Sequence, residues 1–284
     1  MKLLLFRSLW TNGFDLDTAL DDCKTGRFDG IEGPVPSDSQ EREIFSAKLS
    51  DAGVPFIAEI CTAGGYVPKR IATVEQHLED FRRKLEVSLE CVPLFLTSLA
   101  GCDAWPLARS VEFFGRAMDF AAASGVAVGF ETHRSRSTFN PWTTRDLLTE
   151  LPALRLTCDY SHWCCVCERL IDTEPDVLAL CAGRAQHVHA RVGYDQGPQV
   201  PHPAAPEYLA ALEAHERWWK MIWLAHARAG REFTTMTPEF GPDGYLQAAP
   251  FSQKPVADLD EINRWMADRM RATFAAAELD SNLT

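Results

Sequence analysis

The sequence has no apolar run that approaches the roughly 20 residues of a membrane-spanning helix. Its opening segment, MKLLLFRSLW, is largely apolar, but Arg7 interrupts it and no small-residue cleavage site follows. This combination favours a first β-strand over a secretory signal peptide. We therefore expect a protein that has no membrane as its partner.

Positive charge is also scarce. The 284 residues include 28 Lys and Arg against 40 Asp and Glu, which gives a formal net charge of −12. An acidic surface repels both nucleic acids and anionic lipid headgroups. The balance argues against a nucleic acid or an anionic membrane surface as the partner.

Regularly paired cysteines are missing as well. The nine cysteines are odd in number and irregularly spaced, and without a secretory signal we interpret them as reduced thiols of a cytoplasmic protein. Cys164 and Cys167 have a zinc-like spacing, but no second pair lies at a matching distance. We favour packing cysteines over a thiolate metal site for the group around one predicted turn, which consists of Cys158, Cys164, Cys165 and Cys167.

No Gly-x-Gly-x-x-Gly motif follows the first strand, and no low-complexity linker divides the chain. Short β-branched apolar runs instead alternate with longer stretches of helical period, among them Cys167–Cys181 and a closing helix over Asp258–Glu278. Eight β-then-α units predict a single (β/α)8 barrel domain over residues 1–284, with a doubly wound open sheet as the alternative. The strand candidates are Leu3–Leu9, Phe28–Glu32, Pro55–Cys61, Pro93–Ser98, Val126–Glu131, Leu154–Asp159, Ala185–Arg191 and Phe233–Glu239.

Metal-capable side chains recur where the predicted strands end. The segment LRLTCDYSHW ends a buried strand at Asp159, and His162 follows in what we expect to be a turn. The carboxyl ends of the strands of a parallel barrel meet at one face, where the active site lies. Side chains from four consecutive strands therefore converge there. The other three strands supply Glu131 and His133, then His187, His189 and Arg191, and finally Glu239.

Three carboxylates and one imidazole suit a hard or borderline divalent cation that prefers octahedral geometry. Mn²⁺, Mg²⁺ and Co²⁺ fit such a donor set, whereas a structural zinc site would be richer in thiolates. The predicted cofactor is one divalent metal ion, with Mn²⁺ favoured and Mg²⁺, Co²⁺ or Zn²⁺ as alternatives.

The order of these motifs resembles the xylose isomerase-like barrel superfamily of sugar isomerases, ketose epimerases, inosose dehydratases and apurinic endonucleases. The pattern is Glu ending strand five, Asp-x-x-His after strand six, His-x-Arg on strand seven and Glu-Phe after strand eight. The resemblance implies that Glu131 and Glu239 move the substrate proton, one on each face, and that His162 and Arg191 contact substrate oxygens. It also implies one metal ion ligated by Glu131, Asp159, His189 and Glu239.

Departures from the superfamily pattern bear on the reaction. The ketose epimerases carry a further glutamate six residues beyond the strand-five ligand, and here that position is Ser137. Isomerase and dehydratase chemistry therefore stay open beside epimerisation. The endonucleases need extra histidines after strands three and four, where this chain has Cys61 and Leu99, and this argues against a DNA-repair role. Arg134 and Arg136 either meet a phosphate or carboxylate of the substrate or are solvated loop residues.

Several other residues are candidates for the substrate cavity or the core. His133 shares a strand face with Glu131, and Trp105 follows strand four, where an aromatic ring can cover the C–H face of a sugar. The longest aperiodic stretch, Val192–Pro206, follows strand seven and is predicted to be a lid. His187 is interpreted as a core histidine below the metal layer. Trp218, Trp219 and Trp223 belong to the core or to a homodimer interface, and the helical histidines are predicted to lie on the surface: His77, His215 and His226.

The predicted function is divalent-metal-dependent isomerisation or epimerisation of a sugar, sugar phosphate or polyol. A carboxylate would remove the proton α to a carbonyl, and the metal would stabilise the enediolate. Dehydration of a keto-polyol begins with the same step and is the close alternative. A non-catalytic sugar-binding barrel is the alternative from another class, which the Glu131 and Glu239 pair disfavours because binding alone does not need a carboxylate on both faces.

Overall fold

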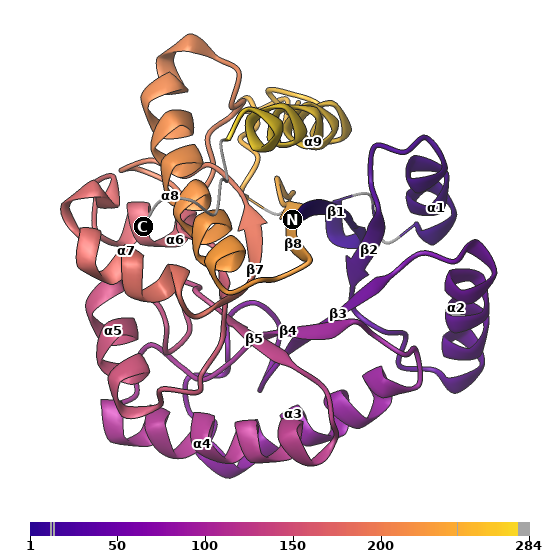
Figure 1. Ribbon diagram of the computed structural model, residues 1–284, viewed down its shortest axis with the longest axis vertical. Coiled ribbons are helices and arrows are strands. Elements are labelled where there is room, and N and C mark those ends of the chain that lie inside the picture. The colour runs from indigo at the N-terminus through magenta and orange to yellow at the C-terminus, as the bar shows by residue number, and fades with distance from the viewer. Residues whose placement is uncertain (12, 14, 243, 278–284) are drawn as a thin grey trace.

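Eight parallel strands close into a barrel, in sequence order, in the computed structural model of the chain (Figure 1). The structure describes residues 1–277 except 12, 14 and 243, so the end of the predicted domain, residues 278–284, lies outside the described residues. The predicted single (β/α)8 barrel is confirmed. The strands are β1 (Lys2–Ser8), β2 (Gly30–Gly33), β3 (Phe56–Cys61), β4 (Phe95–Leu99), β5 (Val128–Glu131), β6 (Leu156–Cys158), β7 (Ala185–Ala190) and β8 (Phe233–Pro238).

Helices surround the barrel, and two of them show how local sequence sets their ends. Asp38 caps α2 by accepting hydrogen bonds from the first-turn N–H groups, and Gly53 ends it in the left-handed conformation. Thr73 and Gln76 form a reciprocal capping box at the start of α3. The α-helices are α1 (Leu16–Lys24), α2 (Ser39–Ala52), α3 (Val74–Leu89), α4 (Leu107–Ala123), α5 (Pro141–Glu150), α6 (Ser161–Val166), α7 (Pro175–Ala182), α8 (Leu209–Arg228) and α9 (Leu259–Ala276).

The sixth unit differs from its prediction. His162 lies in the short helix α6 and not in a turn, and the single helix expected over Cys167–Cys181 is replaced by the 3-10 turn η2 (Ile171–Thr173) and α7. Pro175 explains the break, because a proline has no N–H to donate and its ring clashes with the preceding turn, so it is tolerated only where a helix begins. For the closing helix, Glu278 lies outside the described residues. Among the described helices none is long and apolar enough to cross a membrane.

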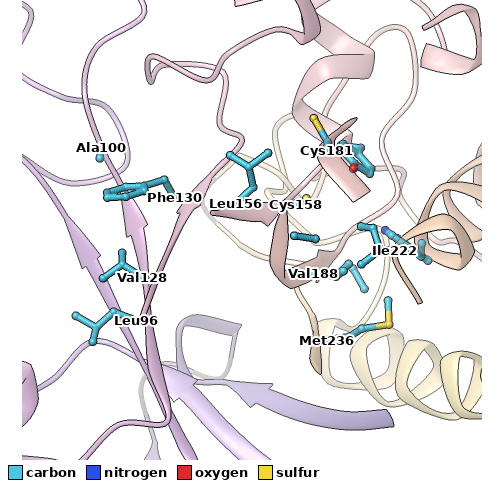
Figure 2. Close-up of a cluster of buried hydrophobic side chains, with 14 of the residues drawn as sticks. Leu96, Ala100, Val128, Phe130, Leu156, Cys158, Cys181, Val188, Ile222 and Met236 are labelled. Atoms are coloured by element: carbon cyan, nitrogen blue, oxygen red, sulfur yellow. The ribbon is translucent and has the colours of Figure 1, made fainter. Parts of the chain in front are cut away.

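The core has two parts. The larger one fills the space between barrel and helices, and Figure 2 shows Leu156, Cys158 and Val188 of β6 and β7 beside Cys181 of α7 and Ile222 of α8. Cys158 therefore faces the helix layer. A smaller cluster fills the barrel interior and consists of Phe6, Ile57 and Phe95. Beneath the carboxyl ends of the strands the barrel is therefore a packed plug, and a ligand can enter only from that face.

The three helical histidines are buried, so their predicted surface position is wrong. His215 donates a hydrogen bond from Nδ1 to the Ala211 carbonyl at 2.8 Å, and its Nε2 accepts one from the Gly193 N–H at 3.3 Å. Both nitrogens of His226 are bonded as well, whereas His77 is bonded through Nδ1 to the Thr62 hydroxyl. Burial lowers the pKa values of His77, His215 and His226 to about 4.

Trp218, Trp219 and Trp223 of α8 are buried within this chain as well, with exposed fractions of 2%, 0% and 0%. Their rings therefore belong to the core and give no support to a homodimer. The homodimer stays a prediction that nothing here tests.

These histidines predict acid sensitivity of the fold. Unfolded histidines protonate near pH 6.5, whereas the folded ones resist protonation to about pH 4. The unfolded state therefore binds more protons between these values, and the free energy of unfolding falls as pH decreases from about 6.5 to 4 and levels off below. His215→Gln should reduce the slope of the free energy of unfolding against pH by up to about 1.4 kcal/mol per pH unit. Urea unfolding at several pH values measures this, and parallel curves for variant and wild type would contradict it.

Candidate metal centre and substrate cavity

A cavity opens at the carboxyl ends of the strands, which is the face where barrel enzymes carry their sites. Strands on both sides of the barrel and the loop after β8 contribute to its wall. The lining residues are Trp10, Glu59, Tyr66, Leu99, Glu131, His133, His189, Arg191, Glu239, Gly241, Pro242 and Tyr245.

Three of the four predicted metal ligands converge in this cavity. The Nδ1 atom of His189 lies 3.0 Å from Oε2 of Glu239 and 3.7 Å from Oε2 of Glu131. The donor atoms of the three residues lie within 4.8 Å of one another. We call Glu131, His189 and Glu239 the triad.

Glu32 holds the imidazole of His189 from below. Its Oε1 lies 3.0 Å from Nε2 of His189, and its Oε2 lies 3.1 Å from Nε2 of His187. Thr235 contacts the other nitrogen of His187 at 2.7 Å, so this histidine is satisfied in the core, as we predicted. A carboxylate that receives the Nε2–H of His189 leaves the Nδ1 lone pair directed at the triad, which is the usual support of a metal-bound histidine.

Asp159, the fourth predicted ligand, lies outside the triad. Its Oδ2 is bonded to the guanidinium of Arg191 and lies 3.3 Å from Nε2 of His162, and its Oδ1 accepts from the Ser161 N–H at 2.9 Å. Arg191 also lies 3.6 Å from Oε2 of Glu239. The structure therefore joins Asp159 to the triad through Arg191.

The residues predicted to contact substrate divide into two pairs. Arg191 and His133 line the cavity, whereas His162 and Trp105 do not. His162 lies behind the wall, with Nε2 2.8 Å from Nη2 of Arg191 and its ring 4.0 Å from that of His133. Burial lowers the pKa of both imidazoles well below the usual value, and Arg191 adds to the effect.

Trp105 and the predicted lid are corrected by the structure. Trp105 packs edge-on against His77 at 4.6 Å and against Phe113, because the short turn after β4 directs it into the helix layer. No residue of Val192–Pro206 lines the cavity, and Val192 and Val200 are fully buried at the base of that loop. The cavity is covered instead by residues that the sequence did not single out.

Tyr245 is the main covering residue. It comes from the loop between β8 and α9, and its ring lies between two guanidinium groups, 4.4 Å from Arg191 and 5.1 Å from Arg134. Its hydroxyl lies 3.4 Å from Nε2 of His133. Arg134 therefore makes a cation–π contact with Tyr245 at the rim of the cavity.

Arg136 and Ser137 have structural positions. Arg136 is fully buried and joins its own loop to the loops after β3 and β4 by donating to backbone carbonyls, including that of Thr62 at 2.8 Å and that of Tyr66 at 3.1 Å. Both earlier alternatives for Arg136, a substrate contact and a solvated side chain, are wrong. Ser137 contacts the Ser110 hydroxyl at 2.9 Å and accepts from the Cys102 N–H, so it contributes to loop packing.

Glu59 is a cavity carboxyl that our sequence analysis missed. It lies on β3 and is 9% exposed. Burial raises its pKa to about 8, and the carboxylates of Glu131 and Glu32 add to the shift. The alternation of β3 carried the signal, because Ile57 faces the barrel interior and Glu59, two residues later, shares that face.

The residues of the triad fit a divalent cation. Nδ1 of His189 and Oε2 of Glu239 are buried and have no hydrogen-bond partner among the described residues. Burial also raises the pKa of Glu131 to about 7, against the opposing effect of His189. Buried carboxyl groups resist ionisation when they lie together, and a cation among them removes that resistance. The donor set of two carboxylates and one imidazole is typical of Mn²⁺, Co²⁺ or Zn²⁺.

The cysteines form no comparable group. All nine are free thiols, and no cysteine belongs to the potential metal-binding groups found in the described part of the chain. Burial raises the pKa of Cys158 to about 12, and that of the Cys167 thiol is raised for the same reason. These thiols fit the packing role that we favoured.

Comparison with known proteins adds information about the fold. No protein-family model matches the chain, and no curated protein matches its sequence. Solved structures do match over nearly the whole chain. An L-ribulose 3-epimerase superposes with a TM-score of 0.63 at 12% identity, and the match covers 100% of this chain and 99% of the epimerase.

Two further solved structures share the fold. The probable 3-DHS dehydratase AsbF from Bacillus anthracis has 14% identity and a TM-score of 0.58, covering 95% of this chain and 99% of the dehydratase. The IOLI protein with a zinc atom has 13% identity and a TM-score of 0.61, covering 98% of both chains. The chain thus has the fold of the xylose isomerase-like barrels, and the fold that the motifs implied is confirmed. At this level of identity the structural similarity shows the fold and does not identify a reaction or a substrate.

Proposed function

We propose that this chain is a divalent-metal-dependent isomerase or epimerase of a sugar or polyol. The observation that carries the proposal is the triad, in which two buried carboxylates and one imidazole direct donor atoms at a common point inside the cavity. The support of His189 by Glu32 strengthens it, because a carboxylate that accepts the Nε2–H of His189 directs the Nδ1 lone pair at the triad. The epimerase, dehydratase and zinc-containing neighbours on this fold are consistent with such chemistry.

The triad and Asp159 would hold the ion. When bound, a divalent ion supplies positive charge that stabilises negative charge developing on substrate oxygens. Glu131 and Glu239 are placed to remove and return a proton at carbon, since each lines the cavity and each has a carboxylate oxygen beside His189. Arg191 orients Glu239 and Asp159 and presents a guanidinium to substrate oxygens. Tyr245 covers these groups and keeps bulk water from the reacting carbon.

Metal content tests this proposal first. Untagged, chelator-free protein should contain about one manganese, cobalt, magnesium or zinc per chain by elemental mass spectrometry, and His189→Asn should lose it because a triad donor is removed. Glu59→Gln is the matched control, since it changes a carboxyl in the same cavity that lies outside the triad, and it should keep the metal. A chain that binds no metal after incubation with manganese would contradict the proposal, and three zinc ions per chain would point to the nuclease chemistry argued against above.

Asp159→Asn separates the two roles that Asp159 can have. If it is the fourth ligand, the variant should lose metal as His189→Asn does. Retention of metal with reduced substrate turnover would instead assign Asp159 to the positioning of Arg191, as in the contacts described above. Product analysis of turned-over sugars then distinguishes isomerisation and epimerisation from loss of water.

A further inference from the structure

The cavity has two unlike halves. Strands β5 to β8 bring the triad and Arg191, whereas β3 and β4 stand across the barrel from β7 and β8. On that remote half the lining residues are Leu99, Tyr66 and one residue with a carboxyl group, Glu59. Trp10, which follows β1, lies between the halves with its ring 5.8 Å from that of His189. Glu59 and the triad therefore line one cavity from different strands.

Among the described residues, the carboxyl group of Glu59 has neither a cation nor a strong hydrogen-bond donor as its partner. The Cys61 thiol at 3.4 Å is the hydrogen-bond partner that the structure gives its carboxyl group, and a thiol is a weak donor. No ion pair within the described residues includes Glu59, although the side chain is more than nine-tenths buried. Burial of a polar group without a good partner is unfavourable, and such groups in a cavity are commonly completed by a ligand.

The cations near the cavity either lie on the triad half or are bonded to other groups. Arg191, which lines the wall, is bonded to Asp159 and lies 3.6 Å from Glu239. The guanidinium of Arg136 is used by backbone carbonyls, and that of Arg134 lies over Tyr245. Phosphate and carboxylate groups need an available guanidinium, ammonium or cluster of N–H donors. The β3 half of the cavity shows none among the described residues and carries an acidic group instead.

We propose that Glu59 binds a hydroxyl group of the substrate at the end remote from the triad, and so selects neutral polyhydroxylated substrates over phosphorylated or carboxylated ones. This inference rests on the proposed function and names its substrate class. A carboxyl group pairs with a hydroxyl whether it is ionised or neutral, whereas in its ionised form it repels an anionic group. Trp10 and Tyr66 line the same cavity, and aromatic residues can provide apolar surface for the C–H groups of a sugar.

Calorimetric titration of the manganese-loaded protein tests the inference. The probes are D-fructose, D-tagatose, D-psicose and a keto-inositol as neutral compounds, and D-fructose 6-phosphate as the anionic counterpart. Wild-type protein should bind a neutral probe more tightly than the phosphate. Glu59→Leu should weaken that binding by roughly 10- to 100-fold, because a buried hydrogen bond to a carboxylate is lost. Glu59→Gln should stay within about threefold, because the amide also pairs with a hydroxyl.

The anionic probe gives the sharper contrast. Measured above pH 8, where the Glu59 carboxyl group with its pKa of about 8 is ionised, binding of this probe should be unchanged or stronger in Glu59→Leu, since a repelling group has been removed. Equal affinity of wild type and Glu59→Leu for the neutral probe would overturn the inference, as would tighter binding of the phosphate by wild type or binding of no neutral probe. Circular dichroism of each variant shows whether it is folded, and its metal content shows whether the triad still binds the ion. The two proposals can fail separately. If the protein binds metal and exchanges substrate protons, but Glu59→Leu leaves binding of the neutral probe unchanged, this inference alone is overturned and the proposed function stands.

Discussion

Replacing Glu239 with glutamine is expected to abolish exchange of solvent deuterium into a turned-over sugar, with a loss of turnover of at least about 10³-fold. The amide cannot take up the proton that a carboxylate removes from carbon. Glutamine has nearly the same shape and Glu239 is 7% exposed at the mouth of the cavity, so the fold should survive. Nuclear magnetic resonance of sugar recovered from D₂O measures the exchange directly.

The control for this variant is Glu213→Gln, which makes the same chemical change on the exposed side of α8. It should exchange deuterium at the wild-type rate. Metal content must be measured on Glu239→Gln as well, because Glu239 belongs to the triad and loss of the ion alone would also stop turnover. If the variant exchanges deuterium as fast as wild type, Glu239 does not move the proton. If it retains the metal and fails to exchange, the carboxylate itself is needed for the proton transfer.

The strands and their ends could be predicted because, in a parallel barrel, the pattern of apolar residues determines where each strand runs and where it ends. A buried parallel strand is a short apolar run, and its last residues reach the same face as those of its neighbours. Glu131, His189 and Glu239 could therefore be placed together without knowledge of the loops. Asp159 was placed there by the same rule, but β6 is only three residues long, and the residue after it turns with α6 towards Arg191.

The covering of the cavity could not be predicted in this way. Tyr245, Tyr66 and Trp105 all lie in connections, where direction depends on tertiary contacts that have no period in the sequence. Trp105 turns into the helix layer because His77 and Phe113 form a pocket for it there. Glu59 is a different case: the period of β3 places it inside the barrel, but a glutamate in the middle of a strand gave no end-of-strand signal.

Arg136 is the second residue whose replacement should have a large effect, here on stability. Its guanidinium is fully buried and is bonded to the carbonyls of Thr62 and Tyr66, in the loop after β3, and to that of Gly101, in the loop after β4. Arg136→Met keeps the volume of the side chain but leaves these carbonyls without their donors. Each buried unsatisfied group costs about 1–3 kcal/mol, so we expect the free energy of unfolding to fall by about 3–5 kcal/mol.

Urea denaturation followed by circular dichroism measures the effect, and Arg136→Lys is the informative control. An ammonium group keeps the charge but has three donors on one atom, so it cannot reach carbonyls that a planar guanidinium spans. The lysine variant should therefore lie between methionine and wild type in stability. A lysine variant as stable as wild type would show that charge alone is required, and a methionine variant as stable as wild type would show that the three loops hold their positions without Arg136. Because the loop after β3 carries Tyr66 into the cavity wall, the lysine variant should also raise KM for a neutral sugar more than it lowers kcat.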